Sequence, residues 1–513
     1  MTRPEKRYFK LYLARHSGNS ATGNHAQLFD AVAAMEQYDE RALRKAFSDA
    51  PFVKHFAIAK RRLYETILLS LDAFHAESSV DARLRRTLHQ TEILHARGLY
   101  PEAERMLRSV RALAQEHEKH SILLQVVEWE HRLLERTNYG EATPETLGTL
   151  AGTAQEHLLQ WELHEALWQL KSRTFLTLYR RGKARTEKDR SELEEIRRNP
   201  LLENGRIPAS ARSRYLYHHV RAALAYALGD AQASITELEC NAELLRPGAG
   251  WAQEEPNLLF GVLSNLAYLH MRAGRHERAL ELLKEFRKLP LQLPQAPSPD
   301  LELKVFAMGT SLELTLWARA GRFDKAVEKL AAAEAGLEHY HDRLSTLRKA
   351  GIQFQAAWVL LGHGRAEEAL RWSHRLLNEP GIEHHRELFA LARLLNVLLL
   401  LELDRRDLLV YALRNTERHL KAHQRTFRCE EAILRFVHRR LKAEQAEEVH
   451  NLLAQLHGEL VELAEDPLEG AVFDHFDPLV WVEGHLTGRT MSQAAQERAE
   501  RRSLSCASDR EAA

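Results

Sequence analysis

The sequence reads Gly-Arg-Phe-Asp-Lys-Ala at residues 321–326, and three other segments repeat its pattern of a glycine followed five residues later by an alanine. These segments are residues 98–103, 274–279 and 364–369, and each lies between two stretches of helical hydrophobic periodicity. Helices commonly end on a left-handed residue, where glycine is favoured, and a small alanine lets the second helix approach the first. The four segments therefore predict a stack of paired helices.

Candidate turns recur at similar intervals along most of the chain. The glycines stand at positions 98, 140, 182, 229, 274, 321 and 364, so the steps are 42, 42, 47, 45, 47 and 43 residues. Each step accommodates two helices of about twenty residues and a turn. Beyond Gly364, residues 404–407 replace the glycine, and a break near Lys442 would keep the interval.

The predicted fold is all-α, an irregular α-solenoid of helix–turn–helix repeats with long helices. We expect an N-terminal helical region over residues 1–97 and the repeat array over residues 98–465. The aromatic-rich residues 466–486 predict a last helix that covers the apolar end of the stack. Residues 487–513 contain no aromatic and few apolar side chains, which predicts a disordered tail.

Three loops are expected to interrupt the array, near residues 183–210, 247–256 and 289–300. The first is highly charged, with one short helix predicted near residues 191–197. The last contains four prolines, so no helix is expected to cross it.

The composition favours a helical protein of the cytoplasm. Lys and Arg together number 72, as do Asp and Glu, so the formal net charge is zero, which argues against a dedicated nucleic-acid binder. The three cysteines match no metal spacing and suit a reducing compartment. No signal peptide is recognisable, and the most apolar run, residues 388–403, is too short and polar to span a bilayer.

The turns resemble those of the tetratricopeptide repeat class, in which an aromatic stands two residues after the glycine and an alanine three residues later. Residues 98–103 and 321–326 fit fully, with Tyr100 and Phe323 as the aromatics, whereas the corresponding positions hold His276 and Ala366 in the other two. That class repeats every 34 residues, whereas the turns of this chain are 42 to 47 residues apart. The chain therefore resembles a divergent member with longer helices. The resemblance implies the fold and no particular ligand.

The whole chain also resembles a family of bacterial proteins of about this length that has no assigned activity. The resembling stretches are residues 6–11, 79–82, 98–100, 199–202 and 476–481. The resemblance implies the same architecture, and we infer no functional residue from it.

Candidate chemistry is confined to histidine clusters. The densest are residues 339–342 and 383–387, and His117 and His120 form a pair three residues apart. The zinc motif H-E-x-x-H, the G-x-S-x-G nucleophile elbow and the G-x-x-x-x-G-K-[ST] phosphate loop are all absent. We therefore predict no catalytic residue, metal or cofactor, and interpret these clusters as solvated helix ends.

The N-terminal region carries a modest basic excess. Residues 1–70 contain twelve Lys or Arg and seven acidic residues, with Lys60-Arg61-Arg62 as a local basic point. Tyr8, Phe9 and Tyr64 could stack on bases beside such charges, although their helical spacing favours core positions.

Three functions remain open from the sequence. The first is a non-catalytic scaffold that binds an unidentified protein or peptide in the groove of the helical repeats. The second is a cytosolic regulator that contacts nucleic acid through its basic N-terminal region, and the third is an enzyme that uses a histidine cluster.

Overall fold

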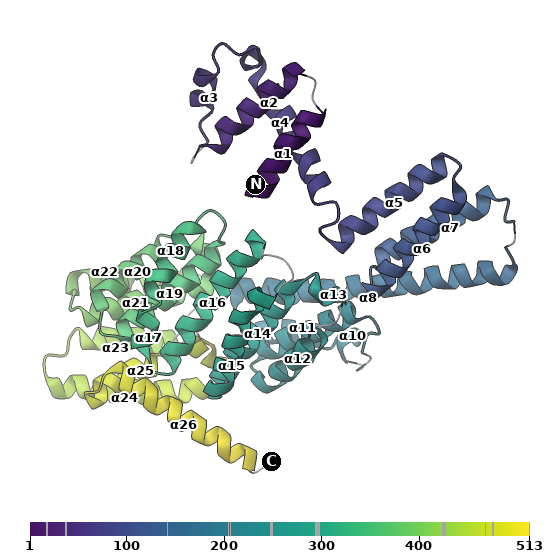
Figure 1. Cartoon of the computed structure of the whole chain (residues 1–513). Coiled ribbons are helices and arrows are strands. Elements are labelled where there is room, and N and C mark those ends of the chain that lie inside the picture. Colours follow the sequence, from purple (N-terminus) through teal and green to yellow (C-terminus); the bar gives the residue numbers. More distant parts are fainter. Residues whose placement is uncertain are drawn as a thin grey trace. The chain divides into compact units, whose positions relative to one another are not determined.

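The computed structural model describes the backbone of residues 1–16, 19–35, 38–140, 142–203, 205, 207–246, 250–292, 298–422, 427–466, 468–474 and 477–511. Every regular element in these residues is a helix, which confirms the predicted all-α class (Figure 1). The high Leu, Ala, Glu and Arg content accounts for this, because these side chains lose little freedom in a helix.

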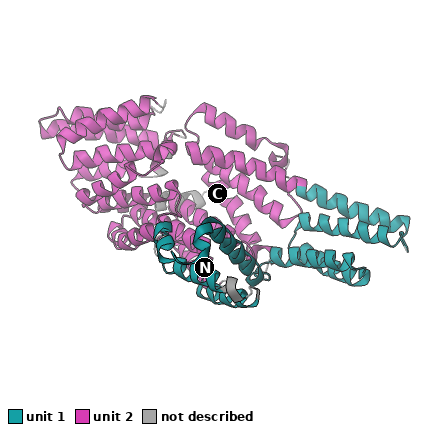
Figure 2. Ribbon diagram, turned by 90° about the horizontal axis from the view of Figure 1, so that it is seen from above, with its two compact units in different colours: residues 1–161 teal, residues 162–513 magenta. Residues whose placement is uncertain are grey.

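The chain divides into two compact units, residues 1–161 and 162–513 (Figure 2). The boundary falls inside the long helix α8 (Pro144–Arg181) rather than at residue 97, where the sequence predicted it. The first predicted turn, at Gly98, therefore belongs to unit 1. The prediction placed the boundary at the first turn motif, but the helices on both sides of that turn pack on each other.

Unit 1 contains two separate apolar clusters. The first part comprises α1 (Arg3–His16), α2 (Asn19–Ala33), α3 (Glu40–Ala46), the 3-10 helix η1 (Pro51–His55) and α4 (Phe56–Phe74). The second part comprises α5 (Val80–Ala96), α6 (Tyr100–Glu116), α7 (His120–Arg136) and the first half of α8. Phe9 and Phe56 are central to the first cluster, and Leu107 and Val126 to the second.

Unit 2 is a succession of helices that pack in consecutive pairs. The elements after α8 are α9 (Glu187–Arg197), α10 (Pro200–Glu203), α11 (Ala211–Leu228), α12 (Ala231–Leu244), α13 (Gly250–Gln253), α14 (Pro256–Arg272), α15 (His276–Gln292), α16 (Pro299–Arg319), α17 (Phe323–Val327), α18 (Leu330–His339), α19 (Thr346–Gly362), α20 (Ala366–Leu377), η2 (Ile382–His384), α21 (Arg386–Glu402), α22 (Arg406–Ala422), α23 (Arg428–Arg440), α24 (Ala446–Glu465), η3 (Gly470–Asp474), α25 (Pro478–Thr487) and α26 (Met491–Glu511). The pairs α11–α12, α14–α15, α19–α20, α21–α22 and α23–α24 pack together, and α14, α16, α19 and α21 also pack in sequence on one another.

Most of the predicted turns have the expected backbone. Of the seven glycines at predicted turns, those at positions 98, 182, 229, 274, 321 and 364 have positive φ, and Asp404 takes the same conformation with φ 48°. Gly140 does not, because Asn138 and Tyr139 already turn the chain with φ of 50° and 59°. Glu118, with φ 51°, makes a turn between α6 and α7 that carries no glycine signal.

All three predicted loops are partly helical. The segment 183–210 contains α9, where a short helix is predicted, and also α10. Residues 250–253 form α13, and α15 continues through Pro290 to Gln292. Phe286 and Leu289 are buried on α15, so their packing outweighs the backbone hydrogen bond that proline removes from the last turn. Residues 247–249 and 293–297 lie outside the described part of the chain.

The C-terminal prediction needs the largest correction. The predicted helix over 466–486 is divided into η3 and α25, and the predicted disordered tail contains the helix α26, in yellow in Figure 1. Ala494 and Ala495 are each only 3% exposed, because small side chains let α26 approach its neighbours closely. A count of apolar side chains misses this kind of packing.

Candidate functional site

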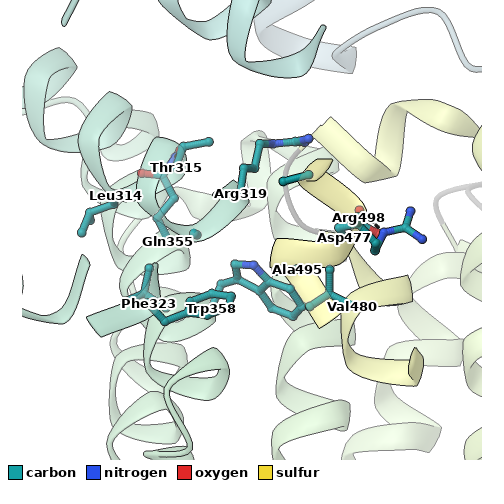
Figure 3. Close-up of a pocket in the computed structure, with 13 residues that line it drawn as sticks. Leu314, Thr315, Arg319, Phe323, Gln355, Trp358, Asp477, Val480, Ala495 and Arg498 are labelled. Carbon is teal, nitrogen blue, oxygen red and sulfur yellow. Dashed lines mark hydrogen bonds and ion pairs between the residues drawn. The ribbon is translucent and has the colours of Figure 1, made fainter. Parts of the chain in front are cut away.

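A cavity of unit 2 lies between the helix pairs and the C-terminal helices (Figure 3). Its lining includes Leu314, Thr315 and Arg319 from α16, Phe323, Gln355 and Trp358 from α17 and α19, and Asp477, Ala495 and Arg498 from the C-terminal segment. Its volume is about 30 Å³, enough for about one or two water molecules. With α25 and α26 in place, the cavity is too small for a metabolite. We call it the α16–α19 pocket.

One side of the α16–α19 pocket is apolar and another is polar. Leu314, Phe323 and Val359 are each at most 1% exposed. Gln355 Nε2 donates a hydrogen bond of 2.6 Å to Thr315 Oγ1. Gln355 Oε1 is buried and accepts no hydrogen bond from the described residues. A buried carbonyl oxygen without a donor is unfavourable, so this atom would gain a hydrogen bond from an N–H group of a ligand that reached it.

An ion-pair cluster joins α26 to α25 beside the pocket. Arg498 Nη1 donates to Glu483 Oε1 at 2.7 Å, and Arg498 Nε to Asp477 Oδ2 at 3.3 Å. The three side chains are only 10–15% exposed, and His457 lies 3.2 Å from Glu483. This cluster holds the helix that closes the pocket.

The turn at Gly321 carries the second attachment of α26. Ser492 Oγ donates to the Gly321 carbonyl, and Gln496 Nε2 donates to the same oxygen at 3.2 Å. A Cβ at Gly321 would lie 2.7 Å from the Ser492 carbonyl oxygen and from the Gln496 nitrogen. The glycine that ends α16 in the repeat pattern therefore also provides the docking point for α26.

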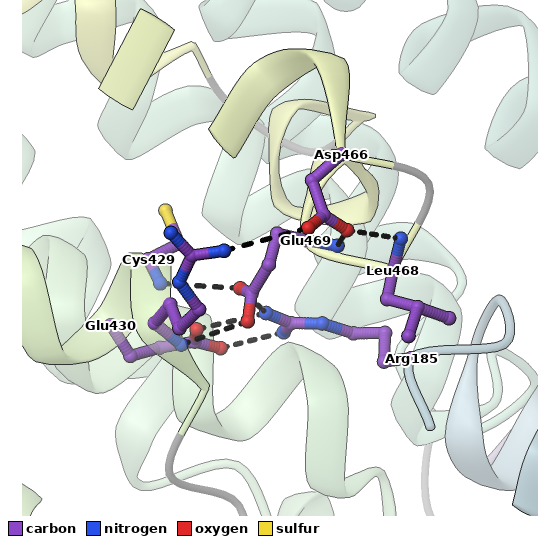
Figure 4. Close-up of polar contacts among 7 residues, drawn as sticks. Arg185, Cys429, Glu430, Asp466, Leu468 and Glu469 are labelled. Atoms are coloured by element: carbon purple, nitrogen blue, oxygen red, sulfur yellow. Dashed lines mark hydrogen bonds and ion pairs between the residues drawn. The ribbon is translucent and has the colours of Figure 1, made fainter. Parts of the chain in front are cut away.

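A buried ionic cluster lies elsewhere in unit 2 (Figure 4). Arg185, in the segment after α8, binds both carboxylate oxygens of Glu430, at 2.6 and 2.8 Å, and Glu469 at 3.3 Å. Glu469 also accepts from the backbone nitrogens of Arg428 and Cys429, and the Arg185 guanidinium lies 3.7 Å from the Phe427 ring centre.

The arrangement of the Arg185 cluster fits a structural role. Burial opposes the charge of Arg185, but hydrogen bonding to Glu430 and the charges of Glu430, Glu387 and Glu469 raise its pKa overall. The side chains of Arg185 and Glu430 are 2% and 1% exposed, so solvent does not reach the pair. The contact joins residues 245 positions apart and ties the start of unit 2 to α23.

The histidine clusters lie in two different settings. His341 and His384 are largely exposed beside Asp342 and Glu383. His120 Nδ1 lies 3.4 Å from Nδ1 of His157 on α8, and His117 is buried. Burial lowers the pKa of His157. Among the described residues, no group of three or more His, Cys, Asp or Glu side chains is placed to hold a metal ion.

Several of the N-terminal basic residues have acidic partners. Lys60 pairs with Glu40, which also binds Arg44 at 3.0 Å, and Arg61 binds Glu65 at 2.9 Å. Phe9 is fully buried in the core, whereas Tyr64 is 62% exposed. The structure therefore does not bring these aromatics together on one basic face.

A half-buried histidine of α11, which no sequence motif marks, faces α8. The His219 ring stacks on Phe175 and on Tyr215, with ring centres 5.0 and 5.3 Å apart. Burial, with a smaller contribution from the Lys171 charge, lowers the pKa of His219 to about 4. The imidazole is therefore neutral near pH 7.

The pKa of His219 predicts a pH-dependent stability. An unfolded histidine titrates near pH 6.5, so the unfolded state binds the additional proton between about pH 6.5 and 4. The free energy of unfolding should fall with decreasing pH in this window, by up to about 1.4 kcal/mol per pH unit. Urea denaturation between pH 7 and 4 should show a shallower dependence for His219→Phe than for the parent. The exposed-site control His341→Gln should match the parent, and equal slopes for all three proteins would contradict the assignment.

No protein-family model matches the chain, and no curated protein is similar to it in sequence. Within the described residues, no helix has the length and apolar character needed to cross a bilayer. Phe323 is marked by the repeat pattern of the sequence, but no sequence pattern marks Gln355, Ser492, Gln496 and Arg498 as parts of the pocket and its closure. The last three stand in a polar segment that gives no periodic signal.

Proposed function

We propose that the protein is a non-catalytic cytoplasmic scaffold that binds a protein or peptide partner at the α16–α19 pocket of a tetratricopeptide-like helical array. The pairwise packing of α14 to α24, with α14, α16, α19 and α21 adjoining one another, supports such an array. In such arrays the first helices of successive pairs line the binding groove.

The observation that carries the proposal is the combination of groups in the pocket. Leu314, Phe323 and Val359 form an apolar floor in the pocket, which Gln355 also lines. The carbonyl oxygen Oε1 of Gln355 accepts no hydrogen bond from the described residues. Binding sites commonly pair an apolar surface with a few polar groups that fix the orientation of the ligand. A helix or peptide supplies both apolar side chains and N–H donors, so its chemistry matches the pocket.

The test is affinity capture from the native cell, with and without nuclease, for the parent chain and two variants. We expect one partner that survives nuclease and that Gln355→Ala reduces at least fivefold. Arg371→Ala, on the largely exposed outer side of α20, should capture it normally. Equal capture by both variants would place binding elsewhere, and loss of every partner with nuclease would favour contact with nucleic acid.

A further inference from the structure

The two C-terminal helices are attached to unit 2 in different ways. Leu479, Val480, Trp481 and Val482 of α25 are all at most 5% exposed, and Trp481 Nε1 donates to Glu402 at 3.0 Å. In the part of α26 whose side chains are described, the only buried apolar residues are Ala494 and Ala495. Since apolar burial scales with area, two alanines stabilise docking far less than the four large side chains of α25.

The remaining contacts of α26 are polar and specific. Ser492 and Gln496 share the Gly321 carbonyl as acceptor, and Arg498 binds Asp477 and Glu483. The hydrogen bonds exchange with water when the helix leaves, and desolvation offsets much of the attraction in the largely buried ion pairs, so the net contribution of these contacts to docking is smaller than their number suggests.

A hinge separates the two helices. Gly488 ends α25 with φ 65°, and the position that a Cβ would occupy there has no atom within 4 Å. Because glycine tolerates a wide range of φ and ψ, the chain can change direction at Gly488 at little backbone cost while α25 stays anchored.

We propose that α26 is a displaceable helix and that the partner of the α16–α19 pocket is a helix with the same recognition pattern. This pattern is a hydroxyl or amide that reaches the Gly321 carbonyl, small residues at the positions of Ala494 and Ala495, and a basic side chain that reaches Asp477 and Glu483. The carboxylates favour a basic partner helix, because an acidic one would be repelled. The inference rests on the proposed function and adds the class of partner and its control by competition.

Removal of α26 provides the direct test. A chain ending at Gly488 should bind a labelled synthetic peptide of residues 489–511 saturably in fluorescence anisotropy. The full chain should bind the same peptide at least tenfold more weakly, because its own α26 has a high effective concentration at the site. Equal binding by both chains, or no binding by a folded truncated chain, would overturn the proposal.

Two glycine variants show where the peptide binds. In the chain ending at Gly488, Gly321→Ala should weaken peptide binding at least tenfold, because its Cβ would occupy the space of Ser492 and Gln496. Gly364→Ala is the matched control, since Gly364 has φ 80° and open space around its Cβ position. Both variants carry the same backbone strain, so equal peptide affinity for the two would refute docking at Gly321.

A variant of the full chain covers the case in which truncation prevents folding. Ala495→Arg places a large charged side chain at a position that is 3% exposed, and should expel α26. Hydrogen exchange at residues 491–501 should then increase, while exchange at residues 479–482 stays unchanged. An increase in exchange at both segments would contradict a hinge at Gly488. A further outcome is that the peptide binds the truncated chain while Gln355→Ala leaves capture of the cellular partner unchanged. That result would support a displaceable α26 and would contradict the proposed function of the pocket.

Discussion

Arg185→Ala is expected to lower the free energy of unfolding of unit 2 by about 3–5 kcal/mol, because it leaves a buried carboxylate without its counterion. Glu430, whose side chain is 1% exposed, would lose both of its contacts with Arg185, and Glu469 would lose one partner beside it. The packing of the guanidinium on Phe427 would also be lost. Chemical denaturation of the full chain, followed by circular dichroism, measures the effect.

A double variant separates charge from packing. Arg185→Met with Glu430→Gln removes both charges while keeping similar volumes, so it should be markedly more stable than Arg185→Ala. Arg371→Ala, whose side chain is 73% exposed, should change the free energy of unfolding by less than about 0.5 kcal/mol. An Arg185→Ala protein as stable as Arg371→Ala would show that the buried cluster does not tie the start of unit 2 to α23.

The local part of the fold was predictable from the sequence. A glycine at a helix end has a strong backbone preference, so the pattern located six turns, including Gly321 and Gly364. The turn at Glu118 escaped because a glutamate in a left-handed conformation leaves no sign in the sequence. The boundary inside α8 escaped for a related reason: a continuous helical pattern does not show where its packing partners change.

The candidate site was predictable only in part, because its closure joins distant segments. Phe323 follows from the repeat pattern, but Arg319, Gln355 and Arg498 meet only after α26 returns to α16. The same holds for Arg185 and Glu430, which look like ordinary surface charges in sequence. Low apolar content suggested a disordered tail, yet two alanines and a few hydrogen bonds suffice to dock a helix. Pairings of this kind depend on tertiary geometry that periodicity does not contain.

Phe323→Ala is expected to lower the free energy of unfolding by about 3–5 kcal/mol through the cavity that it leaves. Phe323 is 1% exposed, and its ring lies so close to Gly362 that a Cβ there would come within 2.3 Å of a ring atom. The aromatic therefore fills the space between the turn at Gly321 and the end of α19. Phe323→Leu should lose less stability because it leaves a smaller void.

The position of Phe323 beside the α16–α19 pocket gives this variant a second measurable effect. Tyr411→Ala is the surface control, since that ring is 69% exposed and its loss should change stability by less than about 0.5 kcal/mol. If Phe323 supports the pocket floor, hydrogen exchange in Phe323→Ala should increase at α16 and α19 before it increases at α11 and α12, which lie outside the pocket lining. Uniform exchange across unit 2 would mean that the aromatic stabilises the whole unit without a special role at the pocket. If Phe323→Ala were as stable as Tyr411→Ala, the result would contradict a core position for Phe323. A buried aromatic of this size cannot be deleted without loss of packing.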